Sequence, residues 1–211
     1  MPNQGFFIAF EGGEGGGKTT QMRLLAARLR RDGHRVILTR EPGGTSLGRR
    51  LRRLLLNGGG VAERAELFLY EADRAQHVAE RVRPALGEGT VVLTDRHADS
   101  STVYQGMCRG LGTAVVLRLN HFATGGLRPD LVIVLDVPPD VGLGRVRSRG
   151  RGPDRMEREK REFHSKVRRG FLALARKRPG STAVLDGRRP KGELADEISA
   201  LVLRRLRRRL G

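Results

Sequence analysis

The chain has 211 residues and a mass of 23.3 kDa, which is enough for one domain with a substantial buried core. A single cysteine, Cys108, excludes an internal disulfide framework, and the five histidines are too far apart for a local zinc motif. No apolar run approaches the length of a membrane span, so we expect a cytoplasmic protein that forms one domain over residues 1–211.

Lysine and arginine outnumber aspartate and glutamate by 41 to 23, which gives a formal net charge of +18 and favours anionic partners. Only five of these cations are lysines, so 41 − 5 = 36 are arginines, spread along the chain as a codon bias would spread them. Aromatic residues are 4% of the chain and Trp is absent, so base-stacking surfaces are scarce. We therefore expect anionic ligands, whose size the charge does not specify, and a nucleic-acid partner is not favoured.

Short apolar runs rich in β-formers alternate with helix-like stretches, a pattern typical of a parallel sheet covered by helices. The predicted strands are nearly continuous apolar runs, as expected for strands buried on both faces. They are Phe6 to Phe10, Val36 to Thr39, Val91 to Asp95, Leu131 to Asp136 and Ala183 to Asp186. Helices are predicted at Lys18 to Arg31, Leu47 to Leu56, Ala62 to Leu86, Thr113 to Thr124, Val141 to Arg149, Arg158 to Arg176 and Gly192 to Leu210. The run Gly58-Gly59-Gly60 is interpreted as a loop.

A glycine-rich segment of the form G-x-x-x-x-G-K-T lies between the first predicted strand and the first predicted helix. Its backbone N–H groups and the helix dipole are suited to phosphate oxygens, and its lysine adds a charge at the β and γ phosphates. The threonine hydroxyl is suited to magnesium. The expected ATP-binding residues are Gly12, Gly13, Glu14, Gly15, Gly16, Gly17, Lys18, Thr19 and Thr20.

Two further polar blocks follow predicted strands, where ligands of open α/β sheets bind. The block at 39–45 reads Thr-Arg-Glu-Pro-Gly-Gly-Thr, and the block at 95–97 reads Asp-Arg-His, followed by a polar stretch to Gly106. The lead-in Phe-Glu-Gly at 10–12, Arg-Pro-Asp-Leu at 128–131, Leu-Asp-Val at 135–137 and Asp-Arg at 154–155 complete an ordered set. In this order the motifs resemble the thymidylate kinase family over essentially the whole chain.

The resemblance implies a three-layer P-loop kinase fold, with a five-stranded parallel sheet flanked by helices and a short mobile lid at about 145–157. It implies transfer of the ATP γ-phosphoryl group to dTMP, Mg²⁺ bound with ATP, and a homodimer. Some family members carry an arginine in the P-loop and others supply it from the lid. The loop position here is Gly15, so the chain is similar to the lid-arginine, bacterial type.

The acceptor site is expected around Tyr70 and Arg74, which are four residues apart and share a face of one predicted helix. By resemblance, a pyrimidine stacks on Tyr70, Arg74 donates to its O4, and Tyr104 packs against the deoxyribose. Glu11 is expected to reach either the 3′-hydroxyl or the metal shell. The full set of expected dTMP-binding residues is Glu11, Arg40, Pro42, Tyr70, Arg74, Arg96, Ser100, Ser101, Tyr104 and Gln105.

No general base is needed, because a nucleotide phosphate with a second pKa of about 6 is already ionised near neutral pH. Catalysis then depends on cations that align two anions and stabilise the transferring group. The segment 145–155 carries five arginines in eleven positions, of which Arg149 and Arg155 are the leading candidates over Arg147 and Arg151. The expected catalytic residues are Lys18, Asp95, Arg96, Arg149 and Arg155, and the expected metal ligands are Thr19 and Asp95.

Two departures from the family pattern leave base selectivity open. Tyr70 stands where the family more often has Phe, and Glu71 occupies a position that is usually small. One alternative is therefore a kinase for dUMP or a modified pyrimidine deoxynucleotide. Another is a P-loop ATPase stimulated by nucleic acid, whose nucleic-acid affinity would depend strongly on salt.

Overall fold

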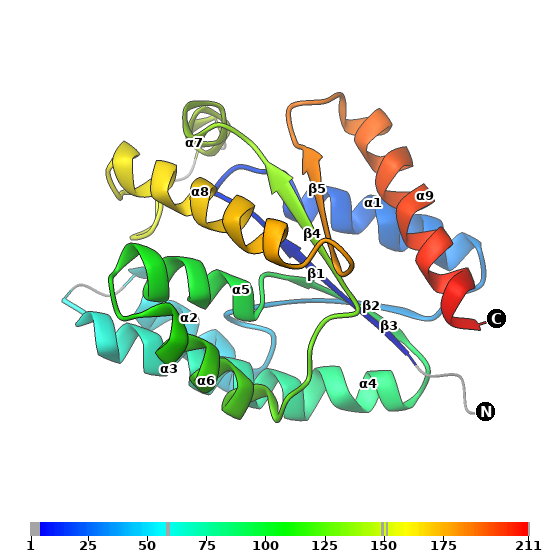
Figure 1. Cartoon of the computed structure of the whole chain (residues 1–211), viewed down its shortest axis with the longest axis horizontal. Helices are drawn as coiled ribbons and strands as arrows, with labels where there is room; N and C mark the ends of the chain where they lie inside the picture. The colour runs from blue at the N-terminus through cyan, green and yellow to red at the C-terminus, as the bar shows by residue number, and fades with distance from the viewer. Residues whose placement is uncertain (1–4, 58–59, 149, 151, 211) are drawn as a thin grey trace.

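A computed structural model describes residues 5–57, 60–148, 150 and 152–210. Its centre is a five-stranded sheet in the order β2-β3-β1-β4-β5 with every pair parallel (Figure 1). The strands are β1 Phe6–Glu11, β2 Val36–Arg40, β3 Val91–Asp95, β4 Leu131–Asp136 and β5 Thr182–Asp186. The predicted α/β class, the parallel sheet and all five strands are confirmed.

Helices cover both faces of this sheet and make the predicted three layers (Figure 1). On one face lie α1 Lys18–Arg31 and α9 Lys191–Leu210. On the other lie α3 Glu63–His77, which continues through a π turn at Val78–Val82 into α4 Arg83–Gly87, together with α5 Ala98–Ser101, α6 Thr113–Thr124 and α8 Arg161–Lys177. Helix α2 Ser46–Asn57 packs on α3, and α7 Pro139–Arg147 packs on α8.

Alternation along β1 divides the core between the two faces. Phe6, Ile8 and Phe10 join the cluster formed with α1 and α9, whereas Phe7 and Ala9 face the opposite layer. All of these side chains are at most 5% exposed. A central strand can therefore be apolar at every position, as the sequence indicated.

The edge strands differ from the prediction that every strand is buried on both faces. Leu38 of β2 is 36% exposed and Val184 of β5 is 43% exposed. The strand order explains the difference, because β2 and β5 lie at the two edges of the sheet, where helices cover them incompletely.

The long helix predicted over 62–86 is interrupted by the π turn at Val78–Val82. Pro84 lies two residues after the end of this turn; its ring lacks an N–H and would clash with the carbonyl four residues earlier in a regular helix. A second π turn, Thr102–Cys108, extends α5 through the polar block that the sequence had indicated only as a substrate segment. Among the described residues, no helix combines the length and apolar character that a membrane crossing requires.

Strand register brings the predicted polar blocks together at the carboxyl edge of the sheet. Asp95, the last residue of β3, is paired with Arg40 of β2 on one side and with Phe10 of β1 on the other. Glu11 ends β1 and leads into the glycine-rich loop. The blocks that follow β1, β2 and β3 are therefore neighbours in space.

Candidate functional site: two cavities joined at Arg96

The glycine-rich loop connects β1 to α1, and its last glycine, Gly17, begins the helix in a left-handed conformation that glycine adopts without strain. Lys18 is 7% exposed and its Nζ donates to the carbonyl oxygens of Gly12 (3.1 Å) and Gly13 (2.9 Å). Burial, followed by the charge of Arg96, lowers the pKa of Lys18. These contacts hold the ammonium group across the loop.

Thr19 and Asp95 meet at the first turn of α1. The Thr19 Oγ1 donates to Asp95 Oδ2 at 2.6 Å. A hydroxyl and a carboxylate at one point provide the hard oxygen ligands that Mg²⁺ prefers. The pair therefore fits a magnesium ion whose remaining ligands are supplied by water and phosphate.

Arg96 is the first residue after β3 and has φ 73°, a left-handed conformation that is rare for a residue with a side chain. One amino group of the guanidinium donates to the Gly12 carbonyl (3.1 Å) and Ser100 Oγ (3.2 Å), and the other donates to Glu14 Oε1 (2.5 Å). The guanidinium also lies 5.1 Å from the centre of the Tyr104 ring. The strained backbone aims this cation across the mouth of the glycine-rich loop.

Glu14 is the anionic partner of Arg96. It also accepts from the Tyr104 hydroxyl at 3.0 Å. Burial alone would raise the pKa of Glu14, but the charges of Arg96 and Lys18 outweigh it and hold the value at about 2. Glu14 is thus an anion at neutral pH, placed where a ligand phosphate would meet Arg96.

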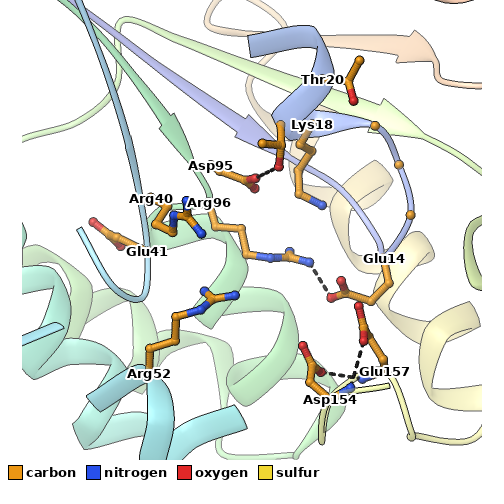
Figure 2. A pocket seen from close by; sticks show the side chains of 14 residues that line it. Glu14, Lys18, Thr20, Arg40, Glu41, Arg52, Asp95, Arg96, Asp154 and Glu157 are labelled. Carbon is orange, nitrogen blue, oxygen red and sulfur yellow. Dashed lines mark hydrogen bonds and ion pairs between the residues drawn. The ribbon is translucent and has the colours of Figure 1, made fainter. Parts of the chain in front are cut away.

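A cavity of 280 Å³ opens above the loop (Figure 2). Its cations are Lys18, Arg40, Arg52 and Arg96, and its carboxylates are Glu14, Glu41, Asp95, Asp154 and Glu157. Burial and the nearby charge of Arg40 lower the pKa of Arg52, which shows how closely the cations are crowded. We call this space the phosphate cavity.

A second, more apolar space adjoins it, and we call this the base cavity. Glu14, Glu41, Arg52, Arg96 and Asp154 line both spaces, so the two are continuous. The other walls of the base cavity include Pro42, Leu56, Tyr70, Ser100, Ser101, Tyr104, Gln105 and Met156. An aromatic ring with amide and hydroxyl groups beside a cluster of cations can bind a flat, polar ring that carries a phosphate.

Comparison with known proteins identifies the family that shares this arrangement. A sequence model described as thymidylate kinase matches residues 10–198. The chain belongs to the thymidylate kinase family. It is similar to the thymidylate kinase of Synechococcus sp. (strain JA-2-3B'a(2-13)), with 49% identity over 200 residues, covering 95% of each chain. It is also similar to that of Deinococcus radiodurans, with 50% identity over 204 residues, covering 96% of this chain and 98% of the relative.

Solved structures agree with the assignment. The crystal structure of thymidylate kinase from Ehrlichia chaffeensis is similar with a TM-score of 0.79 and 30% sequence identity, covering 95% of this chain and 99% of that one. The predicted family and the P-loop kinase fold are confirmed.

Most of the residues expected from the thymidylate kinase resemblance lie on the two cavities. The phosphate cavity has Glu14 to Thr20, Arg40, Asp95 and Arg96, and Gly12 and Gly13 lie at its edge through Lys18. The base cavity has the expected Pro42, Tyr70, Ser100, Ser101, Tyr104 and Gln105.

Arg74 lies behind the base cavity and does not line it. All five of its N–H groups are used within the protein, by the side chains of Glu41, Glu71, Asn120 and Ser101 and by the carbonyl of His97. It is 1% exposed. Its partner Glu71 likewise faces this network and does not line the base cavity. The sequence had raised the possibility that the Glu71 carboxylate alters base selectivity, but this carboxylate lies away from the base cavity.

Glu11 is fully buried and also lies outside both cavities. It accepts from the backbone N–H groups of His97 (2.8 Å) and Ser100 (3.3 Å) and from Ser100 Oγ (2.6 Å). Burial, followed by the charge of Asp99, raises the pKa of Glu11 to about 7. In the structure Glu11 holds the turn that follows Arg96, and both expected roles, at the 3′-hydroxyl or at the metal shell, stay predictions.

None of the described lid arginines lines the phosphate cavity. Arg145 donates to the Gly187 carbonyl at 2.9 Å on the α9 side of the loop, and Arg147 is exposed at the end of α7. Arg155 pairs with Glu66 and donates to the Leu55 carbonyl at 2.8 Å. Arg149 and Arg151 lie outside the described residues.

Gly15 occupies the loop position where some other family members were expected to carry an arginine. Its φ is 66°, and a Cβ at this position would lie 2.0 Å from the carbonyl oxygen of Gly142 in α7. Reciprocally, a Cβ on Gly142 would lie 2.2 Å from the Glu14 carbonyl oxygen. Helix α7 therefore contacts the glycine-rich loop backbone to backbone, and a loop arginine does not fit.

Sequence reasoning missed four residues of the phosphate cavity: Glu41, Arg52, Asp154 and Glu157. Glu41 lies within the polar block at 39–45, which was a signal for it. Arg52 is one of four arginines in α2, at 49, 50, 52 and 53, and only the packing of that helix shows which one faces the cavity. Asp154 and Glu157 lie beside the arginine-rich segment, whose overall charge directed attention to its cations. The motif that contains Asp154 and Arg155 was a signal that this segment belongs to the site.

Proposed function

We propose that this member of the thymidylate kinase family transfers the γ-phosphoryl group of ATP to the phosphate of dTMP, which gives dTDP and ADP. One observation carries the proposal: a phosphate cavity above a glycine-rich loop is continuous with a base cavity, and Arg96 lies at their junction. Two nucleotides bound in such connected spaces would meet at their phosphates.

ATP is the donor. Its triphosphate follows the loop N–H groups and Lys18. Its adenosine fits a space of 270 Å³ beside the loop, lined by Gly17, Thr20, Arg145, Gly187 and Arg189 among others. Thr19 and Asp95 would hold Mg²⁺, which when bound neutralises charge on the β and γ phosphates.

dTMP is the acceptor. We place its pyrimidine against Tyr70, Ser101 and Gln105, its deoxyribose against Tyr104, and its phosphate at Arg96. Arg40 and Arg52 lie in the same cavity and add charge at the acceptor phosphate. When the phosphate takes the Arg96 guanidinium, it replaces Glu14, so the site exchanges one anion for another and the cation is never left uncompensated.

The reaction needs alignment and charge compensation and no added base. Near neutral pH the dTMP phosphate is largely doubly ionised, so its oxygen is ready to attack. Lys18 and Arg96 approach the reaction centre from the donor and acceptor sides, which reduces repulsion between the two anions. Arg149 and Arg155 remain predictions as lid catalysts; the latter would have to leave Glu66.

We also propose that two copies of the chain associate through α2, α3 and α6, which lie side by side (Figure 1). These helices expose large apolar side chains, namely Leu54 (54%), Phe68 (59%), Leu117 (50%) and Phe122 (86%). Apolar side chains at this density mark protein interfaces. A sedimentation measurement that finds only monomer at micromolar concentration would exclude the dimer.

The cytoplasmic location expected from the sequence stays a prediction.

The decisive experiment compares dTMP, dUMP, dCMP and UMP as acceptors, with ATP and Mg²⁺. We expect dTDP as the best product and the poorest turnover with UMP, because a Tyr104 ring packed against the deoxyribose would exclude a 2′-hydroxyl. Equal rates on dUMP would favour the wider pyrimidine kinase. ATP hydrolysis stimulated by DNA or RNA, without phosphorylation of any of the four monophosphates, would overturn the proposal.

A further inference from the structure

Glu66 is a carboxylate in the first turn of α3 and is only 1% exposed. Its Oε2 accepts from Arg155 in an ion pair, and its Oε1 accepts from Gln105 Nε2 at 2.6 Å. Arg109 Nε lies 3.7 Å from the same Oε1. A buried carboxylate is tolerated only with such partners. This single side chain therefore joins three segments that are far apart in the sequence.

The Arg155 side of this junction fixes one wall of both cavities. The Arg155 backbone N–H donates to the Leu56 carbonyl (3.1 Å), and its Nε donates to the Leu55 carbonyl (2.8 Å). These are carbonyls of the last turn of α2, which lack partners within the helix. The residues on either side, Asp154 and Met156, line the cavities. The ion pair with Glu66 thus holds the base of the lid against α2 and α3.

The Gln105 side fixes the orientation of an amide in the base cavity. A carboxylate only accepts hydrogen bonds, so the amide nitrogen of Gln105 must face Glu66. The group that Gln105 offers to a ligand is then its carbonyl oxygen, an acceptor. Thymine and uracil carry a ring N–H that can donate to it, whereas the matching ring nitrogen of cytosine is itself an acceptor and would be repelled.

We propose that Glu66 is a positioning residue that sets pyrimidine selectivity by orienting Gln105 and couples the base cavity to the lid through Arg155. The inference rests on the proposed function, because it names how the same site chooses its acceptor. Arg155 would act here through the segment that it holds in place, which is the alternative to its predicted direct contact with the transferring phosphoryl group; the double-mutant cycle below distinguishes the two.

The test is the variant Glu66→Gln, which keeps the shape of the side chain but can donate to Gln105 and turn its amide. We expect the preference for dTMP over dCMP, measured as a ratio of kcat/KM values, to fall about tenfold, the effect of one misplaced hydrogen bond. The KM for ATP should change by less than about twofold, since Glu66 lies outside the loop.

The matched control is Asp140→Asn. It breaks the ion pair with Arg161 (2.7 Å), which also links the two helices that flank the lid, but both side chains are more than 60% exposed. We expect both kinetic measures to stay within about twofold of the wild type. If Glu66→Gln does not fold, Glu66→Asp keeps the charge but is too short to reach both partners, and should lower the same ratio to a smaller extent.

A double-mutant cycle with Arg155→Gln separates the two roles of Arg155. If it acts through Glu66, the double variant should be hardly slower in kcat than the poorer single variant. Independent effects that multiply would show that Arg155 acts directly at the phosphates and would overturn the coupling. An unchanged dTMP to dCMP ratio in Glu66→Gln would overturn the selectivity role. Failure of the wild-type protein to form dTDP would instead refute the proposed function.

Discussion

Arg96 carries out two tasks that a pair of substitutions can separate. In the proposed function its guanidinium holds the acceptor phosphate, and its backbone has φ 73°, which places that group. Arg96→Ala removes the guanidinium but keeps a Cβ in the strained conformation. Arg96→Gly removes both the guanidinium and the Cβ. The two variants should therefore differ in stability and agree in activity.

The magnitudes follow from the contacts. A residue with a Cβ in the left-handed region costs about 1 kcal/mol more than glycine, so Arg96→Gly should be the more stable variant by about that amount, or about 2–4 °C in Tm. Loss of two charge-assisted hydrogen bonds to the phosphate costs about 3 kcal/mol or more, which is at least about 100-fold in kcat/KM for dTMP. The KM for ATP should change little in either variant.

Two measurements check this reasoning: a coupled assay of ADP formation with dTMP varied, and urea unfolding of both variants. Wild-type kinetics with dTMP would remove Arg96 from the acceptor site. An alanine variant at least as stable as the glycine variant would show that the backbone at this position stores no strain.

Three further outcomes are expected. The pKa of Glu11 is about 7 in the folded protein against an ordinary value of 4.5. The contribution of Glu11 to the free energy of unfolding is therefore fully favourable below pH 4.5 and is lost as pH rises through 7. Urea unfolding should therefore show that the unfolding free energy of Glu11→Gln, relative to that of the wild type, is about 2–3 kcal/mol higher at pH 8 than at pH 5. A difference that does not change with pH would refute the raised pKa. Arg74→Ala leaves the buried Glu41 and Glu71 without their cation and should cost about 3–5 kcal/mol of unfolding free energy, whereas wild-type stability with altered base selectivity would restore Arg74 to the base site. Gly142→Ala pushes α7 away from the glycine-rich loop and should raise the KM for ATP more than the KM for dTMP. Unchanged ATP kinetics would show that α7 and the loop can move apart without disturbing the ATP site.

The central strands and the glycine-rich loop were predictable because their signals are local. Residues 6–10 form an apolar run followed directly by the loop motif, and nothing distant is needed to interpret it. Edge exposure was not predictable, because it depends on the order of strands in the sheet. The same limit applies to Pro42 and Tyr104, whose expected places in the acceptor site came from family resemblance and not from spacing.

The arginines show most clearly where local signals end. In a chain with 36 arginines, charge alone does not distinguish a phosphate ligand from a structural cation. Arg74 and Arg155 were both expected to touch substrate, and in the structure each pairs with a buried carboxylate, Glu41 and Glu66 respectively. Those partners are 33 and 89 positions away, so only the assembled fold reveals the pairing.

The contact between Gly15 and Gly142 also restricts how such an enzyme can evolve. A side chain acquired at either position would collide with main-chain atoms of the other segment, and main chain cannot rotate out of the way as a side chain can. A lineage that moved its catalytic charge from the lid into the loop would have to shift a whole helix at the same time. We therefore expect the loop glycine and the position of α7 to be inherited together, so that a change in the source of the catalytic charge is rare.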